Sequence, residues 1–373
     1  MKRRFVKQFT VALFAFVAVM MFSSVGYAQN GKIDLGEGRW VSVGAGIRSS
    51  FRATKVGSGS GSFYDKGFNI DNIRLYINSE VHKDFQVEFN TDYDGSGDIQ
   101  LLDAVVKYQP SESFSIWFGR HITPSDRANL DGPYYLGIFD YPGLVSMYPA
   151  KFAGRDNGIS VSGHLCMRRL KYAFGIYDGA ANVAGQDSNL YAGRVTVNLI
   201  GDEPDAGGKS GYYTGSGYYG EKDQILALGF VSQFQNDVVA QIGGSARSFF
   251  GYNADLLWER KLSSGGVVDV EGAWYKYNVG RSVAFTGGVP SVNGSAFLMQ
   301  ASYLFPQEVA GVGKFQPVAR YQDFRDSSIL DVGTNFVIRG HSAILSFAYS
   351  PSYTGGAWNN RVDSYTGGAQ FQF

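Results

Sequence analysis

Apolar and polar residues alternate along most of this chain, which is the pattern of strands with two different faces. In one clear stretch, Ile73, Leu75 and Ile77 alternate with Arg74 and Tyr76. Because successive side chains of a strand point to opposite sides, the pattern predicts a sheet with one apolar and one polar face. A soluble β-sandwich and a membrane barrel both contain such sheets, so the alternation alone does not separate them.

The alternation recurs often enough to predict about sixteen strands. They span residues 40–54, 69–82, 84–93, 100–109, 113–120, 155–165, 169–178, 189–200, 223–235, 249–262, 266–279, 295–305, 314–324, 329–339, 341–350 and 362–373. An even number of antiparallel strands puts both termini on one side, which is the periplasmic side of a barrel. The long connection of residues 201–222 also falls on that side. Either this turn is unusual or the count slips by one strand there.

The last predicted strand ends on an aromatic residue. Tyr365, Phe371 and Phe373 share one face, and Gln370 and Gln372 lie between them on the other. Such a strand suits the closing position of an outer-membrane barrel, with one face toward lipid and the other toward the lumen. We therefore predict that the three aromatic residues form the assembly signal, and that the barrel-assembly machinery is a partner.

The first 28 residues have the features of a secretory signal peptide. Four basic residues precede an apolar run at residues 11–22, and small residues up to Ala28 form a cleavage site. The apolar run is short for a membrane helix, which needs about 20 residues. The sequence therefore predicts a cleaved signal at 1–28, a short periplasmic segment at 29–39 and a barrel at 40–373.

The composition agrees with an exported barrel. The chain has 33 basic and 33 acidic residues; without the four basic residues of the signal, 29 remain against 33, which argues against a nucleic-acid partner. Cys166 is the only cysteine, so no internal disulfide can form. The 49 Gly, 28 Phe and 24 Tyr suit a sheet with aromatic girdles at the membrane edges. These features favour the outer membrane of a Gram-negative-type cell.

A series of short motifs occupies the region between about residues 70 and 200. They are Ile73-Arg74-Leu75-Tyr76, Lys83-Asp84-Phe85, Asp92 and Asp94, Leu102-Asp103-Ala104, Tyr108, Phe118-Gly119-Arg120, Thr123-Pro124, Gly154-Arg155-Asp156-Asn157-Gly158-Ile159, Gly163 and Gly193-Arg194-Val195. Together they resemble the phosphate- and polyphosphate-selective porin family (porin O/P type). The resemblance implies a sixteen-stranded porin, usually a homotrimer, whose third outer loop folds into the lumen. It also implies that luminal Arg and Lys residues pass phosphate or other anions in some members.

The connection of residues 121–154 is the candidate constriction loop, because a loop of this length needs a function or is disordered. Rings of basic residues attract anions and rings of acidic residues attract cations. The predicted pore-lining residues are Arg120 and Arg155 beside the loop, Arg127 and Lys151 within it, and Arg48, Arg52, Arg74, Lys107 and Arg194 on strands. Acidic residues at neighbouring polar positions offset much of this field. General or weakly anion-preferring diffusion of small ionic solutes is therefore the expectation.

Metal and enzyme sites find little support in the sequence. Asp92, Asp94, Ser96 and Asp98 have the spacing of a calcium loop, but no helices flank them and an acidic hairpin tip explains them more simply. The four histidines show neither a nucleophile motif nor metal spacing. We therefore expect no enzymatic activity, no metal and no cofactor.

The combined features predict an all-β transmembrane antiparallel barrel that acts as a porin. Its water-filled channel would allow passive diffusion of small hydrophilic solutes, and a preference for anions or phosphate stays open. One alternative is a plugged or structural outer-membrane barrel that acts through its surface loops, which a conductance measurement separates from a porin. Another is a soluble exported β-sandwich that binds carbohydrate through its tyrosines, which would need no detergent.

Overall fold

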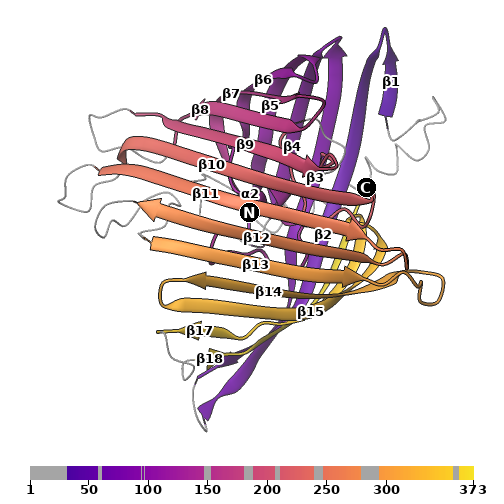
Figure 1. Ribbon diagram of the computed structural model, residues 1–373, viewed down its shortest axis with the longest axis vertical. Helices are drawn as coiled ribbons and strands as arrows, with labels where there is room; N and C mark the ends of the chain where they lie inside the picture. The colour runs from indigo at the N-terminus through magenta and orange to yellow at the C-terminus, as the bar shows by residue number, and fades with distance from the viewer. Residues whose placement is uncertain are drawn as a thin grey trace, which may run out of the picture.

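The chain folds into a single antiparallel sheet (Figure 1). The computed structural model describes residues 32–57, 61–93, 95, 97–146, 153–179, 188–205, 211–238, 247–278, 294–355 and 361–373. The strands are β1 (Lys32–Gly36), β2 (Arg39–Val56), β3 (Phe63–His82), β4 (Phe85–Tyr93), β5 (Ile99–Ser111), β6 (Phe114–Ile122), β7 (Arg155–Leu165), β8 (Leu170–Tyr177), β9 (Leu190–Ile200), β10 (Gln224–Val238), β11 (Arg247–Lys261), β12 (Val267–Asn278), β13 (Gly294–Leu304), β14 (Lys314–Phe324), β15 (Ser327–Arg339), β16 (Ala343–Tyr349), β17 (Ser352–Thr354), β18 (Arg361–Val362) and β19 (Ser364–Gln372). A short helix, α2 (Arg127–Asp131), lies between β6 and β7. Within the described residues, no helix is long and apolar enough to cross a membrane.

Sixteen of these strands, β2 to β16 and β19, form a closed barrel. β19 closes it by pairing with β16 on one side and with β2 on the other, so that Tyr365 lies opposite both Tyr349 and Ala53. The predicted fold class is therefore confirmed. The remaining strands are short: β1 pairs with the start of β2, and β17 and β18 extend the sheet beside the start of β15.

The connection between β9 and β10 is long, as predicted for residues 201–222. β9 ends at Ile200, β10 begins at Gln224, and the two strands are antiparallel neighbours, so the count does not slip there. This connection belongs to the same end of the barrel as both termini. Short turns join neighbouring strands at that end, at residues 83–84, 166–169, 262–266 and 340–342.

The N-terminal region is described from Lys32 onward. The predicted signal peptide at 1–28 lies outside the described residues, and the predicted segment at 29–39 contains β1. β1 turns back along the start of β2, where the ammonium group of Lys32 lies 3.7 Å from the centre of the Trp40 ring. This segment therefore continues the sheet at the end of the barrel that holds the termini.

The outward face of the barrel is apolar. Phe174, Phe230 and Phe347 keep 52, 53 and 55% of their surfaces exposed, although each lies well inside its strand. A soluble protein buries many side chains of this size, whereas a membrane barrel turns them toward lipid. Both the fold and this surface are those of an outer-membrane barrel.

We expect the change of Phe230 to Arg to destabilise the barrel by about 2–4 kcal/mol, the cost of a basic residue facing the middle of a bilayer. Phe230→Leu, which keeps the position apolar, is the matched control and should change stability much less. Urea unfolding of the protein in lipid vesicles measures both. Equal stability of the two variants would contradict the placement of this face in lipid.

Candidate functional site

The lumen of the barrel receives two segments of chain. The first is residues 123–146, which follow β6 and contain α2; we call it the long loop. The second is residues 201–205 and 211–223, between β9 and β10; we call it the insert. Polar side chains on the inward faces of the strands are largely buried against these two segments, as at Arg74 and Asn90.

The long loop makes contact with widely separated strands. Gln370 on β19 and Asn335 on β15 each donate a hydrogen bond of 2.8 Å to a backbone carbonyl of the loop. Tyr275 on β12 donates a 3.0 Å hydrogen bond to the carboxylate of Asp126. Because strands from different parts of a closed barrel bind it, the long loop lies inside the lumen.

The insert crosses the lumen near the terminal end of the barrel. On one side, the ring of Tyr212 stacks on Trp117 of β6, with 5.1 Å between centroids. Further along, the carboxylate of Glu259 on β11 accepts two backbone N–H bonds of the insert, at 2.5 and 2.9 Å. On the far side, the insert reaches His341 in the turn between β15 and β16. The sequence revealed the length of this connection but not its path.

His341 fixes the far side of the insert as a neutral ring. Burial lowers the pKa of His341 to about 4, so the ring carries no charge at neutral pH. Its Nε2 lies 2.9 Å from the carbonyl of Gly217, and its Nδ1 lies 3.3 Å from the hydroxyl of Tyr219. These partners require the tautomer in which Nε2 donates to the carbonyl and Nδ1 accepts from the tyrosine.

The long loop and the insert are joined by a buried ion pair, which we call the clasp. The guanidinium of Arg127 in α2 binds the carboxylate of Glu203 in the insert, and neither side chain is exposed to solvent. Arg127 also donates a 3.1 Å hydrogen bond to the carbonyl of Gly215. Burial raises the pKa of Glu203, but the charges of Arg127, Lys171 and Arg194 and the hydrogen bond from Arg127 together lower it below its ordinary value, so the carboxylate is ionised at neutral pH.

Asp131 strengthens the junction between the two segments. Its carboxylate accepts hydrogen bonds from the hydroxyls of Thr214 and Ser216, at 2.6 and 2.9 Å. Burial and the neighbouring carboxylate of Glu271 raise the pKa of Asp131 well above its ordinary value. Hydrogen bonds with neutral hydroxyls tolerate either protonation state of the carboxyl group, so this contact does not depend on a cation.

Most of the basic residues predicted for the lumen do face inward, and all of these except Arg48 lie in ion pairs. The pairing between Arg194 and Asp255 is bidentate, at 2.6 and 2.8 Å. The others are Arg52 with Asp71 and Asp140, Arg74 with Asp92, Lys107 with Glu88, and Arg155 with Asp103. Arg48 differs, because it donates hydrogen bonds to the side-chain oxygens of Gln370 and Asn72 and to the carbonyl of Phe139. Pairing therefore removes most of the positive charge that these residues would offer to a solute.

Arg120 does not lie with the predicted lumen residues. It shares the outward face of β6 with Phe118, and it donates hydrogen bonds to Asn157 and to the carbonyl of Leu101, at 3.3 and 3.2 Å. The inward face of β6 carries Trp117, which packs against the insert. The position of Arg120 beside the loop in sequence therefore did not place its side chain in the lumen.

The other predicted positions are distributed as follows. Lys151, Asp94 and Ser96 lie outside the described residues. Asp92 is bound to Arg74 at 2.8 Å, and within the described part of the chain no group of three or more His, Cys, Asp or Glu side chains could hold a metal ion. The proposed assembly residues Tyr365, Phe371 and Phe373 are all exposed.

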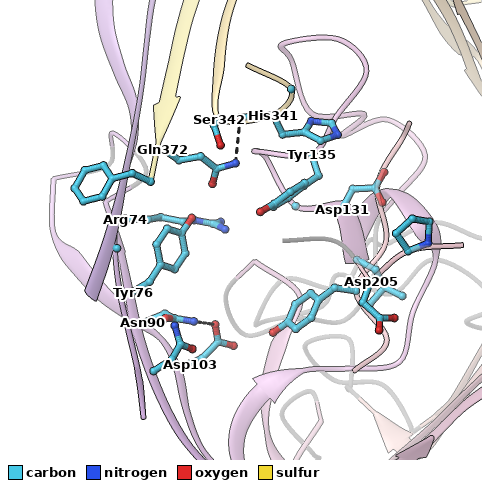
Figure 2. Close-up of a pocket in the computed structure, with 18 of the residues that line it drawn as sticks. Arg74, Tyr76, Asn90, Asp103, Asp131, Tyr135, Asp205, His341, Ser342 and Gln372 are labelled. Carbon is cyan, nitrogen blue, oxygen red and sulfur yellow. Dashed lines mark hydrogen bonds between the residues drawn. The ribbon is translucent and has the colours of Figure 1, made fainter. Parts of the chain in front are cut away.

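A cavity of about 840 Å³ remains between the two segments and the wall formed by β2 to β5. Figure 2 shows Arg74 and Tyr76 of this wall facing Tyr135 of the long loop across the cavity. Asp131 and Asp205 lie on the same side as Tyr135. Residues at the ends of β2 and β19 and in the turn at 340–342 also line the cavity, which places it toward the terminal end of the barrel.

No protein-family model and no curated protein matches this sequence. The fold, however, is similar to solved outer-membrane proteins. The anion-selective porin from Comamonas acidovorans is 13% identical, with 90% of this chain and 100% of that chain covered and a TM-score of 0.59. OprB of Pseudomonas putida is 6% identical, with 89% and 94% covered and a TM-score of 0.57. The trimer form of OmpT of Vibrio cholerae is 10% identical, with 90% and 99% covered and a TM-score of 0.54.

These similarities and the closed barrel define the class: the chain has the fold of the outer-membrane porin-type barrels. At these identities the fold alone is shared, so the solutes of those proteins are not transferred to this one. The expectations that the chain is not an enzyme and needs no cofactor stay predictions.

Removing one partner of the buried Arg194–Asp255 pair should be costly. We expect Arg194→Met to destabilise the barrel by about 3–5 kcal/mol, because the Asp255 carboxylate loses its bidentate partner inside the protein. Arg361→Met breaks a pair whose Arg is half exposed, and should cost about 0–1 kcal/mol. Urea unfolding in vesicles compares the two, and similar losses would argue against a structural role for the buried pair.

Proposed function

We propose that this protein is an outer-membrane porin, which provides a water-filled channel for passive diffusion of small hydrophilic solutes. The observation that carries the proposal is a closed sixteen-strand barrel with an apolar outward face, a polar inward face and a cavity in the lumen. Barrels of this strand number enclose an aqueous channel unless other chain segments fill them. The route runs along the wall of β2 to β5, because the long loop and the insert occupy the rest of the lumen.

The charge arrangement favours diffusion without strong anion selection. The basic residues of the lumen lie mostly in ion pairs, whereas four inward carboxylates accept hydrogen bonds from neutral groups instead. These carboxylates are Asp131, Glu259, Asp269 and Glu271. Because the basic residues are mostly paired, the lumen offers anions no clear advantage. A phosphate channel of the type that the sequence motifs resemble stays a prediction.

We expect refolded protein in a planar bilayer to show a small, stable conductance. Under a KCl gradient, the reversal potential should lie near zero or on the cation side, and phosphate should not block the current. A reversal potential on the anion side together with phosphate block would favour the phosphate-selective alternative. If folded, heat-modifiable protein does not conduct, the plugged barrel is favoured instead. In that alternative, the insert across the lumen is the plug.

A thiol placed in the cavity should report the route of the solute. Asn78 lines the cavity, and the exposed Cys166 can be replaced by Ser to remove the natural thiol. We expect a methanethiosulfonate reagent to lower the conductance of Asn78→Cys in this background. Ser49→Cys, on the outward face of the neighbouring strand, is the control and should not respond. An unaffected Asn78→Cys channel would place the route elsewhere.

The outer membrane is the proposed location, reached through the predicted signal peptide and the barrel-assembly machinery. We further propose a homotrimer, which is supported by the trimer form among the similar structures. Cross-linking of the protein in native membranes tests the trimer, and removal of Phe373 tests the assembly signal. A truncated chain that assembles at the normal rate would contradict the latter.

A further inference from the structure

We infer that the clasp between Arg127 and Glu203 positions the long loop and the insert, and thereby sets the width of the channel. This inference rests on the proposed porin function and adds its size-determining element. The wall of the barrel cannot set this width alone, because sixteen strands enclose a lumen wide enough for an aqueous channel. The free space is set by the segments that fill the lumen.

The two segments enter the lumen from opposite ends. The long loop follows β6, at the end away from the termini, and the insert follows β9, at the end with the termini. Among the described residues, the contacts of Arg127 with Glu203 and Gly215 and those of Asp131 with Thr214 and Ser216 connect the two segments. The backbone N–H of Ser216 also donates a 2.9 Å hydrogen bond to the carbonyl of Tyr135.

The insert is attached to the wall of the barrel by contacts that do not involve the clasp. Tyr212 stacks on Trp117 and donates a 2.6 Å hydrogen bond to the carbonyl of Ile122. Glycines with left-handed backbones bound the inner stretch of the insert, with φ of +141° at Gly211 and +78° at Gly220. Release of the clasp therefore changes the spacing between the two segments without detaching the insert from the barrel.

The clasp also borders the cavity directly. Leu130, Asp131 and Gly132 of the loop line it, as do Pro204, Asp205 and Tyr218 of the insert. Residues adjacent to both partners of the clasp thus form one boundary of the space left for solute. A displacement of either segment would be transmitted to the cavity as a change of its width.

The test removes both charges of the clasp together, in Arg127→Met/Glu203→Gln, because removing one alone would leave a buried charge unpaired. Asp255, which also faces Arg127, keeps its bidentate partner Arg194. We expect a several-fold higher single-channel conductance and faster entry of larger uncharged sugars in liposome-swelling assays. Unchanged conductance and size limit would overturn the inference.

The matched control is Arg320→Met/Asp331→Asn. This pair is also buried, with side chains 2 and 3% exposed and 2.9 Å apart, but it joins the neighbouring strands β14 and β15. It should leave the conductance and the size limit unchanged. An equal increase in the control would also overturn the inference, since general loosening of the barrel would then explain both. Heat-modifiable migration in gels verifies that each variant is folded.

A second variant joins the segments covalently. Thr214→Cys/Asp131→Cys, with Cys166→Ser, replaces two side chains that are in contact. These changes are added to the Arg127→Met/Glu203→Gln variant. We expect low conductance when the new disulfide is oxidised and high conductance when it is reduced. Insensitivity to reduction, with the disulfide verified by mass spectrometry, would overturn the inference. If the unaltered protein and every variant fail to conduct, the porin function itself fails. A closed unaltered protein that conducts once unclasped would support the inference.

Discussion

The constraint on which the whole structure depends is that backbone N–H and C=O groups facing lipid must bind one another. A sheet with a free edge would leave such groups unpaired in the bilayer, at a cost of several kcal/mol each. β19 removes both edges at once by pairing with β16 and β2. Once the sheet is closed, one face of every strand lies toward lipid and the other lies toward the lumen. Large apolar residues cover the outward face, and most of the charged residues on the strands share the lumen.

The polar residues of the lumen then create a second constraint, because buried charges need partners. Much of the lumen is occupied by the long loop and the insert, so the wall charges lose contact with water. The Arg194–Asp255 pair spans β9 and β11, and Arg127 approaches Asp255 from the loop, at 3.5 Å. The ion pairs are therefore consequences of filling the lumen, and those of Arg127 with Glu203 and Asp255 and of Arg52 with Asp140 bind the filling segments directly.

The strands were predictable because their signal is local. Alternation with a period of two needs only neighbouring residues, and the positions of Arg74 and Lys107 on a polar face followed from it. Their partners did not follow, since they depend on the register between strands. Glu203 gave no signal, because its Gly- and Tyr-rich connection lacks periodicity. Glu259, in contrast, occupies an inward position of a predicted strand and could have been found. Arg120 was misplaced because the inward face of β6 carries Trp117.

Because the charges in the lumen are paired, the number of basic residues does not determine the electric field that a solute meets there. A guanidinium bound to a carboxylate presents a dipole to a passing solute, and the field of a dipole falls off faster than that of a charge. The same lumen contains carboxylates such as Glu259, which accepts hydrogen bonds from two backbone N–H groups that carry no full charge. A basic composition on the inward positions therefore does not imply a basic channel. The sign of the electric field follows from the sum of the charges that have no opposite partner. A chain segment folded into the barrel changes this sum as effectively as a substitution in the wall.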